Sequence, residues 1–194
     1  MLFSNPSGQP EQPTRSVGEL AARLLEGPGR LFAIADAARD EQVLSVVRKL
    51  GIEARCLYTG NEAIRLAAYA PYLLSFNATL HPLSRYLIYS WCRQWGIFLR
   101  SRLSAAAISA HFADLMTVRT PEGEAYFRFY DPRVLPEFLS SSTSDMLVKF
   151  FGAAIDCFLV EHDDGNTLIQ YRIAPLERMP GEHYLTTATF SVQR

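Results

Sequence analysis

The chain lacks the sequence motifs that mark the common catalytic sites. None of the patterns G-x-S-x-G, G-x-x-x-x-G-K-[ST], H-E-x-x-H or G-x-G-x-x-G occurs in its 194 residues. Its four histidines are dispersed, and none is spaced from a cysteine or an aspartate as metal ligands are. The case for an enzyme is therefore weak, and we expect no metal site and no cofactor.

Cysteine is scarce, and no segment is typical of secretion or membrane insertion. Cys56, Cys92 and Cys157 are odd in number and far apart, which argues against a disulfide framework and favours a reducing compartment. The first sixteen residues lack a basic region followed by an apolar core, so they do not resemble a signal peptide. The most apolar stretch, residues 64–76, is too short to cross a bilayer. We expect a cytoplasmic protein without a membrane partner.

Neither positively nor negatively charged residues are in excess. The 19 basic and 20 acidic residues give a net charge of −1, and the arginines are scattered along the chain. This distribution provides no electrostatic footprint for nucleic acid. With 48% hydrophobic and 20% charged residues, the chain is typical of a globular protein, and its length suits one domain.

The pattern of apolar residues divides the chain into three parts. Residues 1–15 are predicted to form a mobile tail, residues 16–151 an α/β domain, and residues 152–194 a β-rich extension that packs on the same domain. Ser16 is the expected N-cap of the first helix. The apolar run at residues 31–35 predicts a strand that is covered on both faces.

The predicted fold class is mixed α/β (α+β), a central mixed sheet with flanking helices and a small β-rich C-terminal extension. In the first half, helices alternate with short strands, which favours some parallel pairing. In the second half, Gly96 is expected to supply the left-handed residue that takes the chain from a helix into the strand 97–100. Three further strands are expected at residues 155–161, 166–173 and 184–192.

Two strings of residues place arginine among large aromatic side chains. They are Trp95-Gly96-Ile97-Phe98-Leu99-Arg100-Ser101 and Tyr126-Phe127-Arg128-Phe129-Tyr130-Asp131-Pro132-Arg133-Val134-Leu135. Burial of arginine is costly unless the guanidinium is paired or stacked. The arginines in these strings are therefore expected to have a structural, a chemical or a binding role.

In the second string, strand alternation would place Tyr126, Arg128 and Tyr130 on one face. Phe127 and Phe129 would then face the core. We call the outward row of Tyr126, Arg128 and Tyr130 the ladder. Two interpretations of it remain open: an internal pair between arginine and a carboxylate, or a partner-binding surface. The candidate partner-binding residues are Arg100, Tyr126, Arg128, Tyr130 and Arg133.

The acidic residues near these strings have structural and chemical interpretations. Asp131-Pro132 is typical of a helix start, which predicts a helix over residues 132–139 with Asp131 as its cap rather than as a catalytic acid. Asp36 follows the first predicted strand, where it either anchors a loop or serves as a functional carboxylate. Arg100 could meet Asp36 or Asp131. A hydrolase or phosphate-handling enzyme would need both carboxylates to converge with Arg100 and Arg128.

Four segments occur in a fixed order and support a family resemblance. They are Leu31 to Ala38, Ala70 to Leu73, Trp95 to Ser101 and Tyr126 to Leu135. Together they resemble a bacterial domain family, long catalogued as a domain of unknown function, that is associated with type VI secretion effector chaperones, also called adaptors. The resemblance covers residues 31–151. Within it, Trp95, Gly96, Asp131 and Pro132 are expected to be structural.

The resemblance implies a non-enzymatic bacterial protein of the cytoplasm. Such an adaptor binds a cognate secreted effector and helps to load it onto the spike-tip protein VgrG. The expected partners are the effector and the spike-tip protein, with no nucleic acid and no membrane. The hydrolase remains the alternative, and a small-molecule sensor would require a deep apolar pocket.

Overall fold

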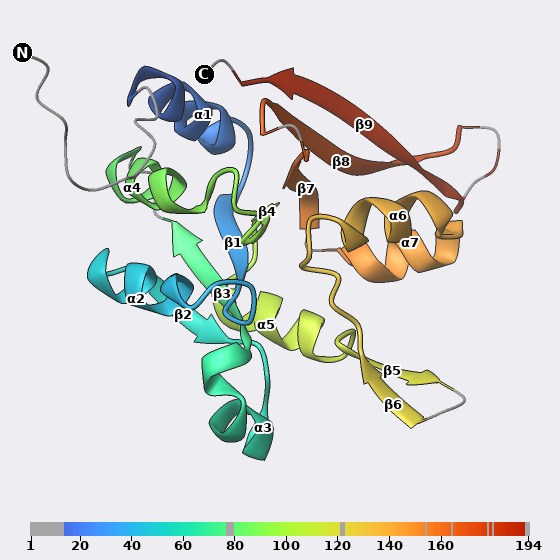
Figure 1. Ribbon diagram of the computed structural model, residues 1–194. Helices are drawn as coiled ribbons and strands as arrows, with labels where there is room; N and C mark the ends of the chain where they lie inside the picture. Colours follow the sequence, from blue (N-terminus) through green and yellow to red (C-terminus); the bar gives the residue numbers. More distant parts are fainter. Residues whose placement is uncertain are drawn as a thin grey trace, which may run out of the picture.

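The computed structural model describes residues 14–76, 80–120, 123–153, 155–163, 165–177, 179 and 181–192 (Figure 1). Most of the predicted N-terminal tail therefore lies outside the described residues. The first helix, α1 (Thr14–Leu25), begins two residues before Ser16, so Ser16 lies within the helix and is not its N-cap. The helix ends before Gly27-Pro28-Gly29, because glycine and proline do not continue a helix.

A seven-stranded sheet forms the centre of the molecule. Its strand order is β2-β3-β1-β4-β7-β8-β9, and every described pairing in it is antiparallel. The strands are β1 (Arg30–Asp36), β2 (Glu53–Cys56), β3 (Pro71–Phe76), β4 (Gly96–Ser101), β7 (Ile155–Glu161), β8 (Thr167–Pro175) and β9 (His183–Ser191).

The predicted α+β class is confirmed, but the predicted parallel pairing is wrong. Helix α2 (Gln42–Lys49) does carry the chain back, so that β1 and β2 run in the same direction. However, β3 lies between them and pairs antiparallel with both. A strand that comes later in the sequence thus separates the two strands of the expected β-α-β unit.

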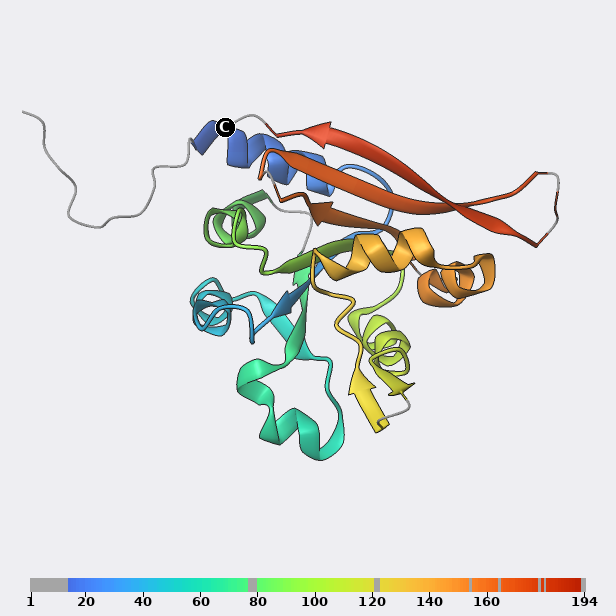
Figure 2. The ribbon, with the colours of Figure 1, turned by 45° about the vertical axis from the view of Figure 1, so that its right-hand side comes forward.

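Helices cover both faces of the sheet (Figure 2). Helices α1, α2 and α4 (Leu80–Ser90) pack on one face, where Leu31, Ala33 and Ala35 of β1 point. Helices α5 (Ala105–Ala113), α6 (Val134–Ser141) and α7 (Ser144–Phe151) pack on the other, against Phe32 and Ile34. The strand at residues 31–35 is therefore buried on both faces, as predicted.

Two small elements stand apart from this layered body. The hairpin of β5 (Thr117–Thr120) and β6 (Gly123–Tyr126) forms a separate two-stranded sheet. Helix α3 (Gly60–Arg65) and the 3-10 turn η1 (Ala67–Tyr69) contain no buried residue. Both elements project on the same side of the molecule (Figures 1 and 2).

The C-terminal strands continue the central sheet. Strand β7 pairs with β4, and β8 and β9 follow it in order. These three strands correspond closely to the predicted ranges. No helix in the described part of the chain is both long enough and apolar enough to cross a membrane.

Gly96 is required because the backbones of β4 and β1 approach each other closely at this position, and not because the chain leaves a helix there. The positive φ angles that turn the chain after α4 belong to Cys92 (64°) and Gln94 (52°). A Cβ atom at Gly96 would overlap the backbone carbonyl oxygen of Ile34 on β1. The glycine therefore allows β4 to pair with β1 at this point.

We expect Gly96→Ala to lower the free energy of unfolding by about 3 kcal/mol, because the backbone of β1 must shift to make room. Gly18→Ala in α1 is the matched control, since no atom lies within 4 Å of its added Cβ. That control should raise stability by about 0.5–1 kcal/mol. Urea unfolding measures both, and a Gly96→Ala variant as stable as wild type would contradict this role.

Candidate functional site

Four chain segments meet at one end of the sheet. They are residues 37–41 after β1, residues 91–95 before β4, residues 127–133 before α6, and residues 162–163 and 165–166 between β7 and β8. The antiparallel register explains the meeting, because Ala35 near the end of β1 lies opposite Gly96 at the start of β4, and Phe98 lies opposite Leu159 near the end of β7. We call these segments the four loops.

Asp36 joins the first of these loops to the third. Its side chain is only 4% exposed. Its Oδ1 accepts a hydrogen bond of 3.0 Å from the Ala38 backbone N–H, and its Oδ2 accepts one from Nη2 of Arg128. The loop-anchoring role expected of Asp36 is therefore present, together with an ion pair. The arginine that it binds is Arg128 and not Arg100.

Arg128 is half-exposed and lies between Asp36 and an aromatic ring. Its guanidinium carbon is 5.9 Å from the centroid of Tyr130. Burial alone would lower the pKa of Arg128, but the hydrogen bond and the charge of Asp36 raise it above the ordinary arginine value. Arg128 therefore remains charged, and it neutralises a carboxylate that water hardly reaches.

Asp131 makes a second acid–arginine pair next to the first. Its Oδ1 accepts from the backbone N–H and the Nε of Arg133, both at 2.9 Å, and its Oδ2 accepts from Nη2 at 2.6 Å. Burial alone would raise the pKa of Asp131, but the hydrogen bonds from Arg133 lower it below its usual range. The carboxylate thus organises the turn that leads into α6.

The helix after this turn begins later than predicted. Helix α6 starts at Val134 rather than at Pro132, and Pro132 lies buried in the preceding turn. Pro136 consequently falls in the first turn of α6, where a backbone N–H would have no helical acceptor. The later start explains why Pro136 does not interrupt the helix.

The predicted ladder of Tyr126, Arg128 and Tyr130 is wrong as a strand. Strand β6 ends at Tyr126, and the chain then turns, so the three side chains do not share one face. Tyr130 is 1% exposed and packs beside Phe129, which is fully buried in the core as predicted. Burial raises the pKa of the Tyr130 hydroxyl.

Tyr126 is 40% exposed and belongs to a different surface. Its ring packs against Tyr58 with centroids 5.0 Å apart. A hydrogen bond with Glu62 raises the pKa of Tyr126 to about 12. These contacts link the β5–β6 hairpin to α3 and the residues before it.

A second set of contacts, which the sequence analysis does not predict, connects the other loops by hydrogen bonds. The Trp95 indole N–H donates to Asp40 at 2.9 Å, and Nε2 of Gln94 donates to Asp163 at 2.6 Å. The Trp91 indole N–H donates to the Gly165 carbonyl oxygen at 2.8 Å. The signal for two of these contacts was the pair of tryptophans, because a buried indole N–H requires an acceptor.

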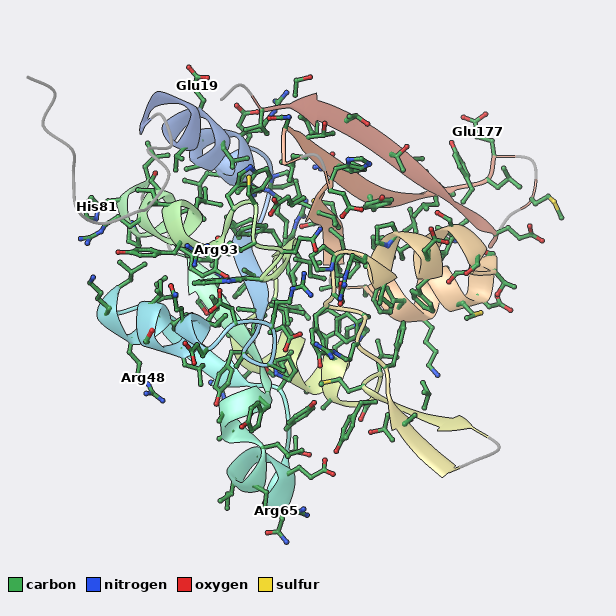
Figure 3. The ribbon with its side chains drawn as sticks, viewed as in Figure 1. Glu19, Arg48, Arg65, His81, Arg93 and Glu177 are labelled. Carbon is green, nitrogen blue, oxygen red and sulfur yellow. The ribbon has the colours of Figure 1, made fainter. Side chains whose placement is uncertain are left out.

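Arginines from two loops complete this second set. Arg39 donates to Oε1 of Gln94 at 3.0 Å. Arg93, which is labelled in Figure 3, lies 3.6 Å from a carboxylate oxygen of Asp40. Glu161, the buried last residue of β7, holds the loop at residues 91–95, since its carboxylate accepts from the Cys92 N–H at 2.6 Å.

Arg100 lies away from the four loops and closes the end of α1. It is 1% exposed, and its Nη2 donates to the Leu24 carbonyl oxygen at 2.8 Å. Its Nη1 donates to the carbonyl oxygens of Gly27 and Pro28 at 2.9 and 3.2 Å. Burial lowers the pKa of Arg100. The Leu24 carbonyl is one of those that a helix end leaves unpaired, and Gly27 and Pro28 belong to the loop that follows α1.

The four groups of the hydrolase hypothesis do not converge. Arg100 lies opposite Leu31, whereas Asp36 is five positions further along β1, a separation of about 17 Å. Of the candidate partner-binding residues, Arg100 and Tyr130 are buried, so in this structure they are not available to a partner. Tyr126, Arg128 and Arg133 remain accessible, and their binding role stays a prediction.

Comparison with known protein families matches residues 31–147 to the model named Domain of unknown function (DUF4123). The match covers more than half of the chain. This protein belongs to the DUF4123 family. No curated protein and no solved structure gives a significant match.

The DUF4123 match begins at β1 and ends within α7. It includes the two acid–arginine pairs and three of the four loops. The fourth loop, with Glu161 and Asp163, lies outside the match, as do β7, β8 and β9. The family region therefore supplies most of the polar network, and the C-terminal strands complete it.

We expect Arg128→Met to lower the free energy of unfolding by about 2 kcal/mol, because the buried Asp36 carboxylate loses its partner. Adding Asp36→Asn should recover at least half of this loss, since the amide carries no charge. Urea unfolding of the two single variants and the double variant measures the coupling. Strictly additive effects would contradict the pair.

The lowered pKa of Asp131 predicts a pH-dependent contribution to stability. The folded state favours the ionised carboxylate, so the contribution is present above the unfolded carboxyl pKa, about 3.8, and is lost as the pH falls through the lower folded value. The stability difference between wild type and Asp131→Asn should therefore shrink in acid. Urea unfolding at a series of pH values tests this, and a difference independent of pH would contradict it.

Proposed function

We propose that this DUF4123 protein is a cytoplasmic chaperone and adaptor for a type VI secretion effector. In this role it binds its cognate effector without covalent chemistry and helps to load it onto the spike-tip protein VgrG. A complex that survives purification needs about 800 Å² of buried surface on each partner. Family membership is the observation that carries the proposal, because this family is associated with such adaptors.

The internal pairing of the polar motif residues supports a binding role. Asp36 and Asp131 are occupied by Arg128 and Arg133, and the Trp95 indole N–H is occupied by Asp40. These side chains satisfy one another and fix the loops that carry them. The motifs thus provide a rigid framework, and recognition is left to the surfaces that this framework holds in place.

The surface best suited to an effector lies between α3 and the β5–β6 hairpin. Tyr126 is 40% exposed. A pocket of about 290 Å³ opens there, lined by Glu62, Thr117, Ala125 and Tyr126. An exposed aromatic ring beside a pocket suits a side chain of a partner, and tyrosine is frequent among the residues that dominate binding energy.

Co-expression with the effector encoded by a neighbouring gene tests the proposal. We expect a stable complex between the two proteins that persists through size-exclusion chromatography. The spike-tip protein should then join this complex rather than bind the chain in its absence. If neither the effector nor the spike-tip protein co-purifies, the proposal fails.

We expect Tyr126→Ala to weaken effector binding at least tenfold, because it removes the aromatic ring at the centre of this surface. Met146→Ala is the matched control, since Met146 is similarly exposed (46%) but lies on α7. Isothermal titration calorimetry measures both affinities. Equal affinities for the two variants would place the effector elsewhere on the molecule.

A further inference from the structure

The two edges of the seven-stranded sheet differ in length and charge. At one edge, β2 has four residues, two of which are the charged Glu53 and Arg55. At the other, β9 has nine residues, His183-Tyr-Leu-Thr-Thr-Ala-Thr-Phe-Ser191, with no Asp, Glu, Lys, Arg or Pro. Exposed edge strands are normally protected by such residues or by bulges. Strand β9 has no bulge, because its register with β8 is continuous.

The hydrogen bonds at the two ends of β9 show which backbone groups face outward. The Leu176 N–H donates to the Glu182 carbonyl oxygen at 2.7 Å, and the Val192 N–H donates to that of Asn166 at 2.6 Å. In an antiparallel ladder, every second residue is hydrogen-bonded to the neighbouring strand. Even-numbered residues of β9 therefore face β8, and odd-numbered residues direct their N–H and C=O groups to the outer edge.

One outward group is already used within the chain. The His183 N–H donates to the Ser144 hydroxyl at the start of α7, at 2.8 Å. Leu185, Thr187, Thr189 and Ser191 remain, and no strand in the described part of the chain pairs with them. The side chains of Thr187, Thr189 and Ser191 are exposed. Figure 3 shows the long β8–β9 hairpin between Glu19 on α1 and Glu177 near its turn.

These four residues are spaced symmetrically about Ala188, and the edge is therefore complementary to itself. We propose that β9 pairs antiparallel with β9 of a second copy of this chain, across a two-fold axis at Ala188. Leu185 then lies opposite Ser191 of the second copy, and Thr187 lies opposite Thr189 of the second copy. All four outward residues form hydrogen-bonded pairs, and none is left unpaired.

The side chains suit this register. Threonine opposite threonine is a favourable cross-strand pair, and no charge lies opposite a like charge along the strand. On the other face, Tyr184, which is 48% exposed, lies opposite Val192 of the second copy. Ala188 meets its own equivalent at a non-hydrogen-bonded position, where Cα atoms are about 4.5 Å apart and a small side chain fits.

The mass of the purified full chain tests the proposal. Sedimentation equilibrium should give twice 21.8 kDa for the wild type. Thr187→Lys with Thr189→Lys places lysine opposite lysine in both central pairs and should weaken the dimer at least tenfold. Thr187→Lys with Thr189→Glu places lysine opposite glutamate and should restore it. A wild type that is monomeric at every concentration overturns the proposal. The β9 edge would then pair with an extended segment of another protein instead.

Cross-linking tests the register in a Cys92→Ser background, which removes the exposed native thiol. Ala188→Cys should form an intermolecular disulfide, because the two Cα atoms lie within bridging distance. Thr186→Cys is the matched control: it shares the face of Ala188 but lies opposite Phe190 of the second copy. Equal cross-linking of both variants, or of neither, overturns the two-fold axis at Ala188.

Discussion

The ion pair between Asp36 and Arg128 is the constraint on which the arrangement of the four loops depends. Asp36 ends the interior strand β1, and its carboxylate is almost completely buried. A carboxylate in that position requires a cation, because removal of its partner would leave an uncompensated charge in the interior. Arg128 meets this requirement only if residues 127–133 lie across the end of the sheet. The path of the chain into α6 follows from that contact.

The arginines that stand out in the sequence have separate architectural roles at opposite ends of the sheet. Arg128 and Arg133 hold the end formed by the four loops, while Arg100 binds the carbonyl oxygens at the end of α1. The aromatic residues around them supply core packing through Phe129 and Tyr130 and an exposed surface through Tyr126. Neighbouring residues of one string thus divide between the core and the surface.

Local features of this fold were predictable because their causes are local. Ser104 and Thr143 are N-caps that accept hydrogen bonds from the first turns of α5 and α7, and the apolar run at β1 is buried on both faces. The position of β3 between β1 and β2 was not predictable, since strand order depends on contacts between distant segments. The same holds for Arg100, whose acceptors lie more than seventy positions away. Sequence pattern places an arginine in apolar surroundings, but it does not say which acceptor the arginine reaches.

The central claim is that the ion pair of Asp36 and Arg128 holds the four loops together as one unit. Native-state hydrogen exchange of the Arg128→Met variant tests it most directly. We expect the amides of Ala38, Asp131 and Arg133 to lose protection together, while those in the middle of β1 and β4 keep it, because the loops open without unfolding the sheet. Unchanged protection of all three loop amides would contradict the claim.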